Sequence, residues 1–194
     1  LIQTPTMNIL VDTGAGSKQA EKYKDAYGLN GNKLLKGLKK LELTARDIDK
    51  VVLTHLHFDH GGGCTKLDRS GNAVPTFPKA DYLVQRACWE EANEPNERSK
   101  SSFHSDDFLP LEEAGVLTLL DGDSEVAQGI TTKVTHGHSE GHQVVLIEAG
   151  SERIAFAGDL IPTPYHVPLI NIAALDHSPN DTLAQKRDLL KMAI

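Results

Sequence analysis

The stretch THLHFDHGGG, residues 54–63, places four metal-binding side chains within six positions, directly after an apolar run. The run before it, residues 49–54, predicts a strand that ends near the first histidine. Alternate residues on an extended segment point the same way, so His55 and His57 can reach one ion. Asp59 and His60 follow where the strand has ended and can turn toward a second ion. Imidazole and carboxylate ligands suit zinc, with iron or manganese as alternatives, so this stretch predicts a metal site.

A second histidine-rich stretch, THGHSEGH at residues 135–142, has two incompatible interpretations. It contains the G-x-S-x-G pattern of a serine nucleophile elbow around Ser139, and it also offers three histidines to a metal. An elbow requires a strand, a sharp turn and then a helix. The residues that follow, HQVVLIEAG, are apolar and β-branched and predict a strand instead. The metal interpretation is therefore favoured, and the remote alternative is a serine hydrolase whose triad is completed by Asp159 or Asp176 with His166 or His177.

Composition limits the function classes that the chain can belong to. Its 194 residues suit one domain, and its net charge of −7 argues against a general nucleic-acid binder. No run approaches the ~18 apolar residues that a membrane span needs. Two cysteines are too few for a disulfide framework, which favours a cytoplasmic location. Because the chain starts at Leu1 and not at a methionine, we expect its N-terminus to be incomplete.

The remaining pattern predicts several further strands and two clear helices. Apolar runs bounded by turns predict strands at residues 8–11, 80–85, 116–120 and 130–135, and a hairpin of 143–148 with 153–157. One helix is predicted within residues 32–43, whose leucines share a face, and another begins at Ser178 with Pro179 in its first turn. Residues 86–115 begin as a helix and then become polar, which is typical of a lid or a surface loop.

Three motifs together, THLHFDHGGG, THGHSEGH and FAGD (residues 156–159), resemble the metallo-β-lactamase superfamily. The pattern of that family is H-x-H-x-D-H, a later G-H-[ST]-x-G-H, and an aspartate that closes a strand. The resemblance implies a single domain over residues 1–194, of the α+β class, built as a four-layer αβ/βα sandwich of two mixed sheets flanked by helices. We expect this domain to be incomplete at both ends, because a last histidine ligand of the family lies after a further helix and strand.

The resemblance also implies two divalent metal ions, most simply Zn²⁺. The implied ligands come from all three motifs: His55, His57 and His142 for the first ion, Asp59 and His60 for the second, and Asp159 as the bridge. In this scheme His138 has a supporting role, and Asp12 in VDTG is a turn residue near the site. The implied reaction is hydrolysis by a hydroxide that bridges the two metals. Asp59 is the implied catalytic residue, which orients the nucleophile and passes its proton to the leaving alkoxide.

Within the superfamily, HLHFDHGGG and residues 74–98 look most like the lactonase branch. The expected substrate is therefore a small molecule with an ester-like bond, with an N-acyl homoserine lactone as the leading candidate and quorum quenching as the role. Tyr165 and His166 lie in the apolar segment LIPTPYHVPLI, residues 160–170, and are expected to contact the substrate.

Two departures from the family pattern leave other functions open. The family usually has a proline where His136 stands, and its lactonases carry a tyrosine closer to the bridging aspartate than Tyr165 is. Phosphotriester, thioester and β-lactam hydrolysis share the implied site, as does an iron dioxygenase. A metal-binding module with a degenerate site is the non-enzymatic alternative. A homodimer is compatible with the sequence, which does not fix the oligomeric state.

Overall fold

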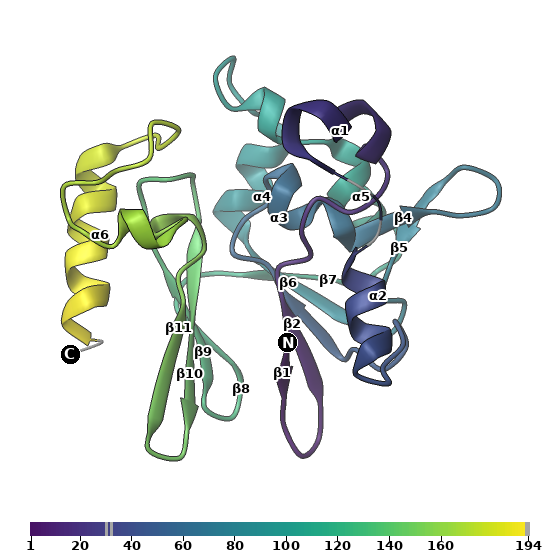
Figure 1. Ribbon diagram of the computed structural model, residues 1–194, viewed down its shortest axis with the longest axis horizontal. Coiled ribbons are helices and arrows are strands. Elements are labelled where there is room, and N and C mark those ends of the chain that lie inside the picture. The colour runs from purple at the N-terminus through teal and green to yellow at the C-terminus, as the bar shows by residue number, and fades with distance from the viewer. Residues whose placement is uncertain (30, 32, 193–194) are drawn as a thin grey trace. The chain divides into compact units, whose positions relative to one another are not determined.

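The computed structural model describes residues 1–29, 31 and 33–192, and the chain divides into two compact units (Figure 1). Unit 1 comprises residues 1–84 and 92–119, and unit 2 comprises residues 85–91 and 120–194. Helix α4, Arg86–Asn93, contributes residues to both units. The single domain over residues 1–194 stays a prediction. Among the described residues, no helix is long and apolar enough to cross a membrane.

Unit 1 is built on a five-stranded sheet in the order β1-β2-β3-β6-β7. Its strands are β1 (Ile2–Gln3), β2 (Asn8–Val11), β3 (Lys50–Val52), β6 (Asp81–Gln85) and β7 (Leu117–Leu120). Strands β2, β3 and β6 are parallel, and β1 is antiparallel to β2, so the sheet is mixed. Ile9, Val51 and Val84 are fully buried, as expected for the central strands of a parallel sheet.

Helices and a small hairpin flank this sheet in the described part of unit 1. The helices are α1 (Ala20–Tyr27), α2 (Lys33–Lys40), α3 (Phe58–Gly61) and α5 (Ser105–Glu113), and the hairpin pairs β4 (Thr65–Leu67) with β5 (Ala73–Pro75). Helix α2 confirms the amphipathic helix predicted there, because it buries Leu38 and exposes its lysines. The loop after β2 and the loop after β3 leave the sheet at the carboxyl ends of two adjacent parallel strands, where polar side chains collect.

Unit 2 consists of an antiparallel four-stranded sheet and one long helix. The sheet order is β11-β10-β9-β8, with β8 at Ser124–Ala127, β9 at Ile130–Val134, β10 at Gln143–Ala149 and β11 at Glu152–Phe156. The predicted hairpin is confirmed by the pairing of β10 with β11. Helix α6 (Pro179–Met192) begins with the predicted proline, and its Leu189 packs with Val144 and Leu160 in the core of this unit.

One stretch differs from its prediction. Residues 86–115 were expected to become loop-like after the first turns, but Ser105–Glu113 forms helix α5 in spite of Pro110 inside it. The helix carries acidic residues in its first turn, which suit the positive end of the helix dipole, and it buries Phe108 and Leu111. Burial of these apolar side chains outweighs the local polarity that suggested a loop.

Candidate metal centre

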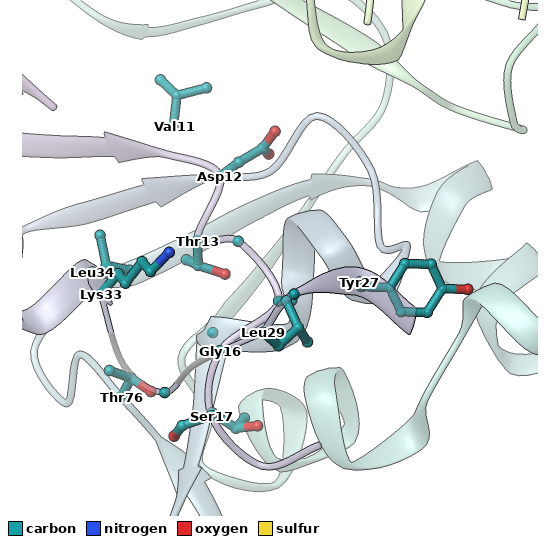
Figure 2. A pocket seen from close by; sticks show the side chains of 16 residues that line it. Val11, Asp12, Thr13, Gly16, Ser17, Tyr27, Leu29, Lys33, Leu34 and Thr76 are labelled. Atoms are coloured by element: carbon teal, nitrogen blue, oxygen red, sulfur yellow. The ribbon is translucent and has the colours of Figure 1, made fainter. Parts of the chain in front are cut away.

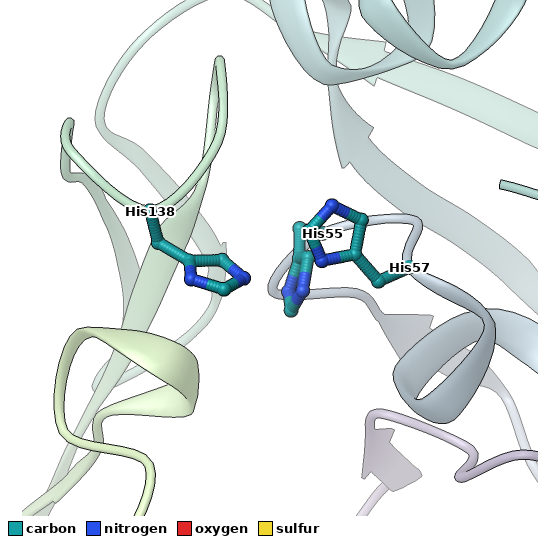
Figure 3. A group of neighbouring side chains, drawn as sticks. All are labelled: His55, His57 and His138. Atoms are coloured by element: carbon teal, nitrogen blue, oxygen red, sulfur yellow. The ribbon is translucent and has the colours of Figure 1, made fainter. Parts of the chain in front are cut away.

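His55 and His57 occupy the loop between β3 and α3 and provide the first group of metal donors in unit 1. They are 0% and 8% exposed, and their ring centroids lie 4.4 Å apart (Figure 3). The ring of His60, at the end of the same motif, lies 4.2 Å from the ring of His55. Three imidazoles this close would repel one another if protonated, whereas neutral imidazoles are preferred ligands of zinc. The donor set of this loop therefore fits a bound divalent cation.

Asp12 contacts the Nδ1 side of the His60 ring. The Asp12 carboxylate lies 2.8 Å from Nδ1 of His60, and it accepts hydrogen bonds from the backbone N–H of Thr54 at 2.8 Å and from the Thr54 hydroxyl at 2.9 Å. Asp12 has a φ of +55°, a left-handed conformation that aspartate tolerates better than most residues. A carboxylate on one ring nitrogen orients a histidine and presents the other nitrogen to a metal. Asp12 is thus a supporting residue of the site and more than a turn residue.

Asp59 lies in the first turn of α3, beside His60. Its side chain is 55% exposed, and one carboxylate oxygen lies 3.7 Å from Nε2 of His60. Within one short motif, the side chains of His55 and His57 are therefore buried and that of Asp59 is exposed. An exposed carboxylate next to buried donors is suited to contact both a bound ion and an incoming substrate.

Unit 2 supplies further donors from the loop between β9 and β10. His138 is 3% exposed, with Nδ1 at 3.0 Å from the buried Asp176 carboxylate and Nε2 at 3.3 Å from the Asp159 carboxylate. Figure 3 also draws His138 on this loop. Gly137 has a φ of +117°, and a Cβ there would collide with the backbone of Thr182 in α6. This glycine lets the loop lie directly on the helix, which fixes the position of His138.

His142 is buried but has a different environment from His138. Its Nδ1 lies 2.6 Å from the Thr135 hydroxyl, and its Nε2 accepts the backbone N–H of Asp159 at 3.1 Å. Within unit 2, Nε2 of His138 faces the Asp159 carboxylate, and Nε2 of His142 faces the Asp159 backbone N–H. The family resemblance implied His142 as the ligand and His138 as its support, and this assignment stays a prediction.

The remaining predicted site residues also lie in unit 2. Asp159 is in a short 3-10 turn (Gly158–Leu160) after β11, with its side chain 20% exposed. Tyr165 and His166 occupy a second 3-10 turn, where Tyr165 is 83% exposed and His166 bonds the Thr163 hydroxyl through Nδ1 at 2.8 Å. Their contact with a substrate stays a prediction.

Ser139 does not stand on a nucleophile elbow. Strand β10 begins at Gln143, directly after the histidine-rich loop, so the strand predicted there is confirmed and the helix that an elbow requires is not present at residues 143–149. The Ser139 side chain is also buried, with the residue 2% exposed. The loop therefore lacks the exposed hydroxyl that nucleophilic attack needs.

A pocket of about 460 Å³ lies in unit 1, along the loop that follows β2 (Figure 2). Asp12, Thr13 and Gly16 of this loop line it, together with Leu29 and the first residue of α2, Lys33. The carboxylate of Asp12 thus borders the pocket while it holds His60.

Comparison with known proteins assigns the family. The model of the metallo-beta-lactamase superfamily matches residues 1–193. The chain belongs to this superfamily. A probable metal-dependent hydrolase from Staphylococcus aureus has a solved structure that matches this chain with a TM-score of 0.88 at 32% identity. That match covers 98% of this chain and 67% of the other, so the α+β class and the metallo-β-lactamase fold are confirmed.

Curated relatives of this superfamily member include lactonases. An N-acyl homoserine lactonase of Bacillus cereus is 33% identical over 111 residues, which covers 57% of this chain and 37% of that protein. An N-acyl homoserine lactonase of a Bacillus species is 30% identical over 163 residues, covering 76% of this chain and 56% of that protein. The chain thus spans roughly a third to a half of these relatives' lengths, and lactonase activity is a property of the relatives.

Proposed function

We propose that this protein is a metal-dependent hydrolase that opens an ester-like bond, with lactones, and N-acyl homoserine lactones among them, as its substrates. The observation that carries the proposal is the cluster of imidazoles at His55, His57 and His60, in a chain that belongs to the metallo-β-lactamase superfamily. The first two are buried, and the third is supported by the carboxylate of Asp12. Buried histidines with carboxylate support are typical of metal ligands and uncommon in ordinary cores.

The proposed ligands come from the three sequence motifs. In unit 1 they are His55, His57, Asp59 and His60. In unit 2 they are Asp159 and one histidine of the loop before β10, for which the contact with Asp159 favours His138 over the predicted His142. The proposed cofactor is a pair of divalent ions, most simply Zn²⁺, with iron or manganese as alternatives that the same donors suit. A homodimer, a cytoplasmic location and the absence of nucleic-acid binding stay predictions.

The chemistry follows from the donors. A bound divalent cation lowers the pKa of water toward neutrality and polarises a carbonyl oxygen. Asp59 has a half-exposed carboxylate that can orient a water molecule, accept its proton and deliver that proton to the leaving alkoxide. His60 stays fixed during this transfer because Asp12 and the backbone of Thr54 form one hydrogen-bonded unit with it.

Aromatic side chains beside the motif support a substrate with an apolar part. Phe58, the residue before Asp59, stacks on Tyr23 with ring centroids 5.4 Å apart, and it contacts Tyr27 at 5.5 Å. Tyr27 is 61% exposed, so this aromatic cluster has an accessible surface. In unit 2, the exposed Tyr165 and the neighbouring His166 remain the proposed polar contacts to the substrate.

Proton release from a panel of lactones tests the proposal. The protein is loaded with Zn²⁺, its metal content is measured, and acyl homoserine lactones of several chain lengths are compared with simple δ-lactones. We expect release that a chelator abolishes and added zinc restores. If protein shown to hold its metal releases no proton from any lactone, the lactonase proposal is overturned. Phosphotriesters, thioesters and β-lactams are then the next substrates to assay.

Metal content also tests the proposed ligands one at a time. His57→Ala in unit 1 and Asp159→Ala in unit 2 are each expected to lower the amount of zinc bound. Glu91→Ala is a matched control, because this acid accepts the backbone N–H of Glu140 at 2.9 Å but is not a proposed ligand. Zinc binding that is unchanged in either variant would contradict the assignment of that residue as a ligand.

A further inference from the structure

Unit 1 contains a buried ion pair that the proposed reaction does not use. Nζ of Lys18, on the loop after β2, lies 2.9 Å from the carboxylate of Asp107 in the first turn of α5. Their side chains are only 5% and 4% exposed. Burial holds the pKa of the Asp107 carboxyl above its usual value, and the charge and hydrogen bond of Lys18 offset this only in part. Removing two charges from water costs free energy, so the contacts of a buried ion pair indicate which part of the structure it fixes.

Lys18 holds the glycine turn that follows the metal-binding motif. Besides its bond to Asp107, the ammonium donates to the carbonyl of Gly62 at 2.6 Å and to the carbonyl of Thr65 at 3.0 Å. These contacts use all three protons of the ammonium group. Gly62 is the first residue of the short 3-10 turn Gly62–Cys64, which begins two residues after His60, and Thr65 directly follows that turn.

The same turn packs backbone to backbone against the loop that carries Lys18. Gly63 donates its N–H to the carbonyl of Gly14 at 2.8 Å, and Thr13 donates its N–H to the carbonyl of His60 at 2.8 Å. A Cβ at Gly16 would collide with the carbonyl of Gly62. With contacts this close, a shift of the Lys18 loop must move the turn and the end of the metal-binding motif with it.

Asp107 is also connected, through two other side chains, to a residue inside the metal-binding motif. Asp107 lies 3.6 Å from Nδ1 of His104, and Nε2 of His104 lies 3.2 Å from the hydroxyl of Tyr23. The Tyr23 ring in turn stacks on Phe58, which separates His57 from Asp59. Asp107 is therefore connected both to the residues that follow His60 and to a residue inside the motif.

We propose that Lys18 and Asp107 are positioning residues, whose buried ion pair fixes the glycine turn behind Asp59 and His60 and thereby sets the affinity of the metal site. This inference rests on the proposed metal centre but not on any particular substrate. The pair acts through backbone carbonyls, so its effect on the metal is geometric. If the pair only stabilised the fold, its removal would lower the free energy of unfolding and leave metal binding by the folded protein unchanged.

Metal binding by Lys18→Met distinguishes these two roles. The variant keeps most of the aliphatic stem and removes the three donors. Its Kd for Zn²⁺ is measured by competition with a chelator, and its Co²⁺ absorption spectrum reports the ligand geometry. We expect the Kd to rise about tenfold to a hundredfold, as for other supports of metal ligands, and the Co²⁺ spectrum to change. Lys133→Met is the matched control, because Lys133 also pairs with an aspartate, at 3.4 Å, but is 36% exposed.

A second variant covers the case in which Lys18→Met does not fold. Asp107→Asn keeps the shape and one oxygen acceptor for Lys18 but removes the negative charge. We expect a smaller rise in the zinc Kd than in Lys18→Met, with circular dichroism confirming that the variant is folded. If the first variant is unfolded, Asp107→Asn decides by the same criteria.

The outcomes separate this inference from the proposed function. A folded variant whose zinc Kd and Co²⁺ spectrum match those of the wild type and of Lys133→Met overturns the positioning role. A wild-type protein that binds neither Zn²⁺ nor Co²⁺ overturns the metal centre and this inference with it. A wild-type protein that binds zinc but opens no lactone overturns the lactonase proposal alone.

Discussion

Replacing Asp12 by asparagine should weaken metal binding while leaving the fold nearly intact. The wild-type carboxylate accepts two hydrogen bonds from Thr54, and it lies 2.8 Å from Nδ1 of His60. Asparagine keeps one oxygen for the backbone N–H of Thr54, but it presents an N–H₂ group where the second oxygen was. That group can donate to Nδ1 of His60 only if the ring carries its proton on Nε2. The proton then occupies the nitrogen that would bind the metal.

The expected magnitudes follow from these contacts. The variant loses at most one or two hydrogen bonds, each worth about 1 kcal/mol net, and asparagine also tolerates the φ of +55° at this position. Loss of the support to His60 should raise the zinc Kd about tenfold to a hundredfold. This corresponds to about 1.4–2.8 kcal/mol less stabilisation by zinc at a saturating concentration. The metal-free protein should therefore change little and the zinc-loaded protein should change more.

Urea unfolding with and without zinc measures both quantities. Asp47→Asn is a matched control, because Asp47 accepts hydrogen bonds from the backbone N–H and the hydroxyl of Thr44, both at 2.7 Å, on an exposed turn. The control should keep the full stabilisation by zinc. If Asp12→Asn also keeps it, His60 does not depend on Asp12 for its tautomer, and the assignment of Asp12 as a support of the site is refuted.

Three further predictions concern other residues. His138→Ala should lower the zinc content more than His142→Ala does, because His138 faces the Asp159 carboxylate, and metal analysis showing the reverse order would restore His142 as the ligand. Asp59→Asn should lower kcat on a lactone by about a hundredfold or more with a smaller loss of zinc, and equal losses would count against its role in proton transfer. Burial raises the pKa of the Cys64 thiol from 9.0 to about 12, so the folded state keeps a proton that the unfolded state loses above pH 9. The free energy of unfolding should then fall by about 1.4 kcal/mol per pH unit from pH 9 upward, and a Cys64→Ser variant with the same slope would contradict this.

Much of the fold was predictable because its elements are marked locally. The strand over residues 8–11 and the hairpin of β10 with β11 follow from apolar runs and turn residues, and the structure confirms them. Helix α5 was missed because its stability comes from burying Phe108 and Leu111 and not from its local composition. Tertiary burial of this kind cannot be read from a segment that contains both proline and several acids.

The candidate site was predictable in its residue types and less so in their roles. The motif at residues 54–63 identifies His55, His57, Asp59 and His60 by spacing alone. The ranking of His138 and His142 depends on which ring meets Asp159, a contact between residues far apart in the sequence. The importance of Lys18 was not predicted for the same reason, since its partner Asp107 is distant in the chain and its other contacts are backbone carbonyls.

The supports of the metal-binding motif come from one short segment of the chain. Asp12 and Lys18 stand at the two ends of DTGAGSK, residues 12–18, with Asp12 on the His60 ring and Lys18 on the turn behind it. The motif itself has left strand β3 and forms only a four-residue helix, so its own hydrogen bonds cannot hold it rigidly. Gly16, which lies between the two supports, lets the segment approach the turn at backbone distance. The DTGAGSK segment is therefore as much a part of the candidate site as the histidine motif. The histidine motif supplies the ligands, and the DTGAGSK segment fixes their orientation.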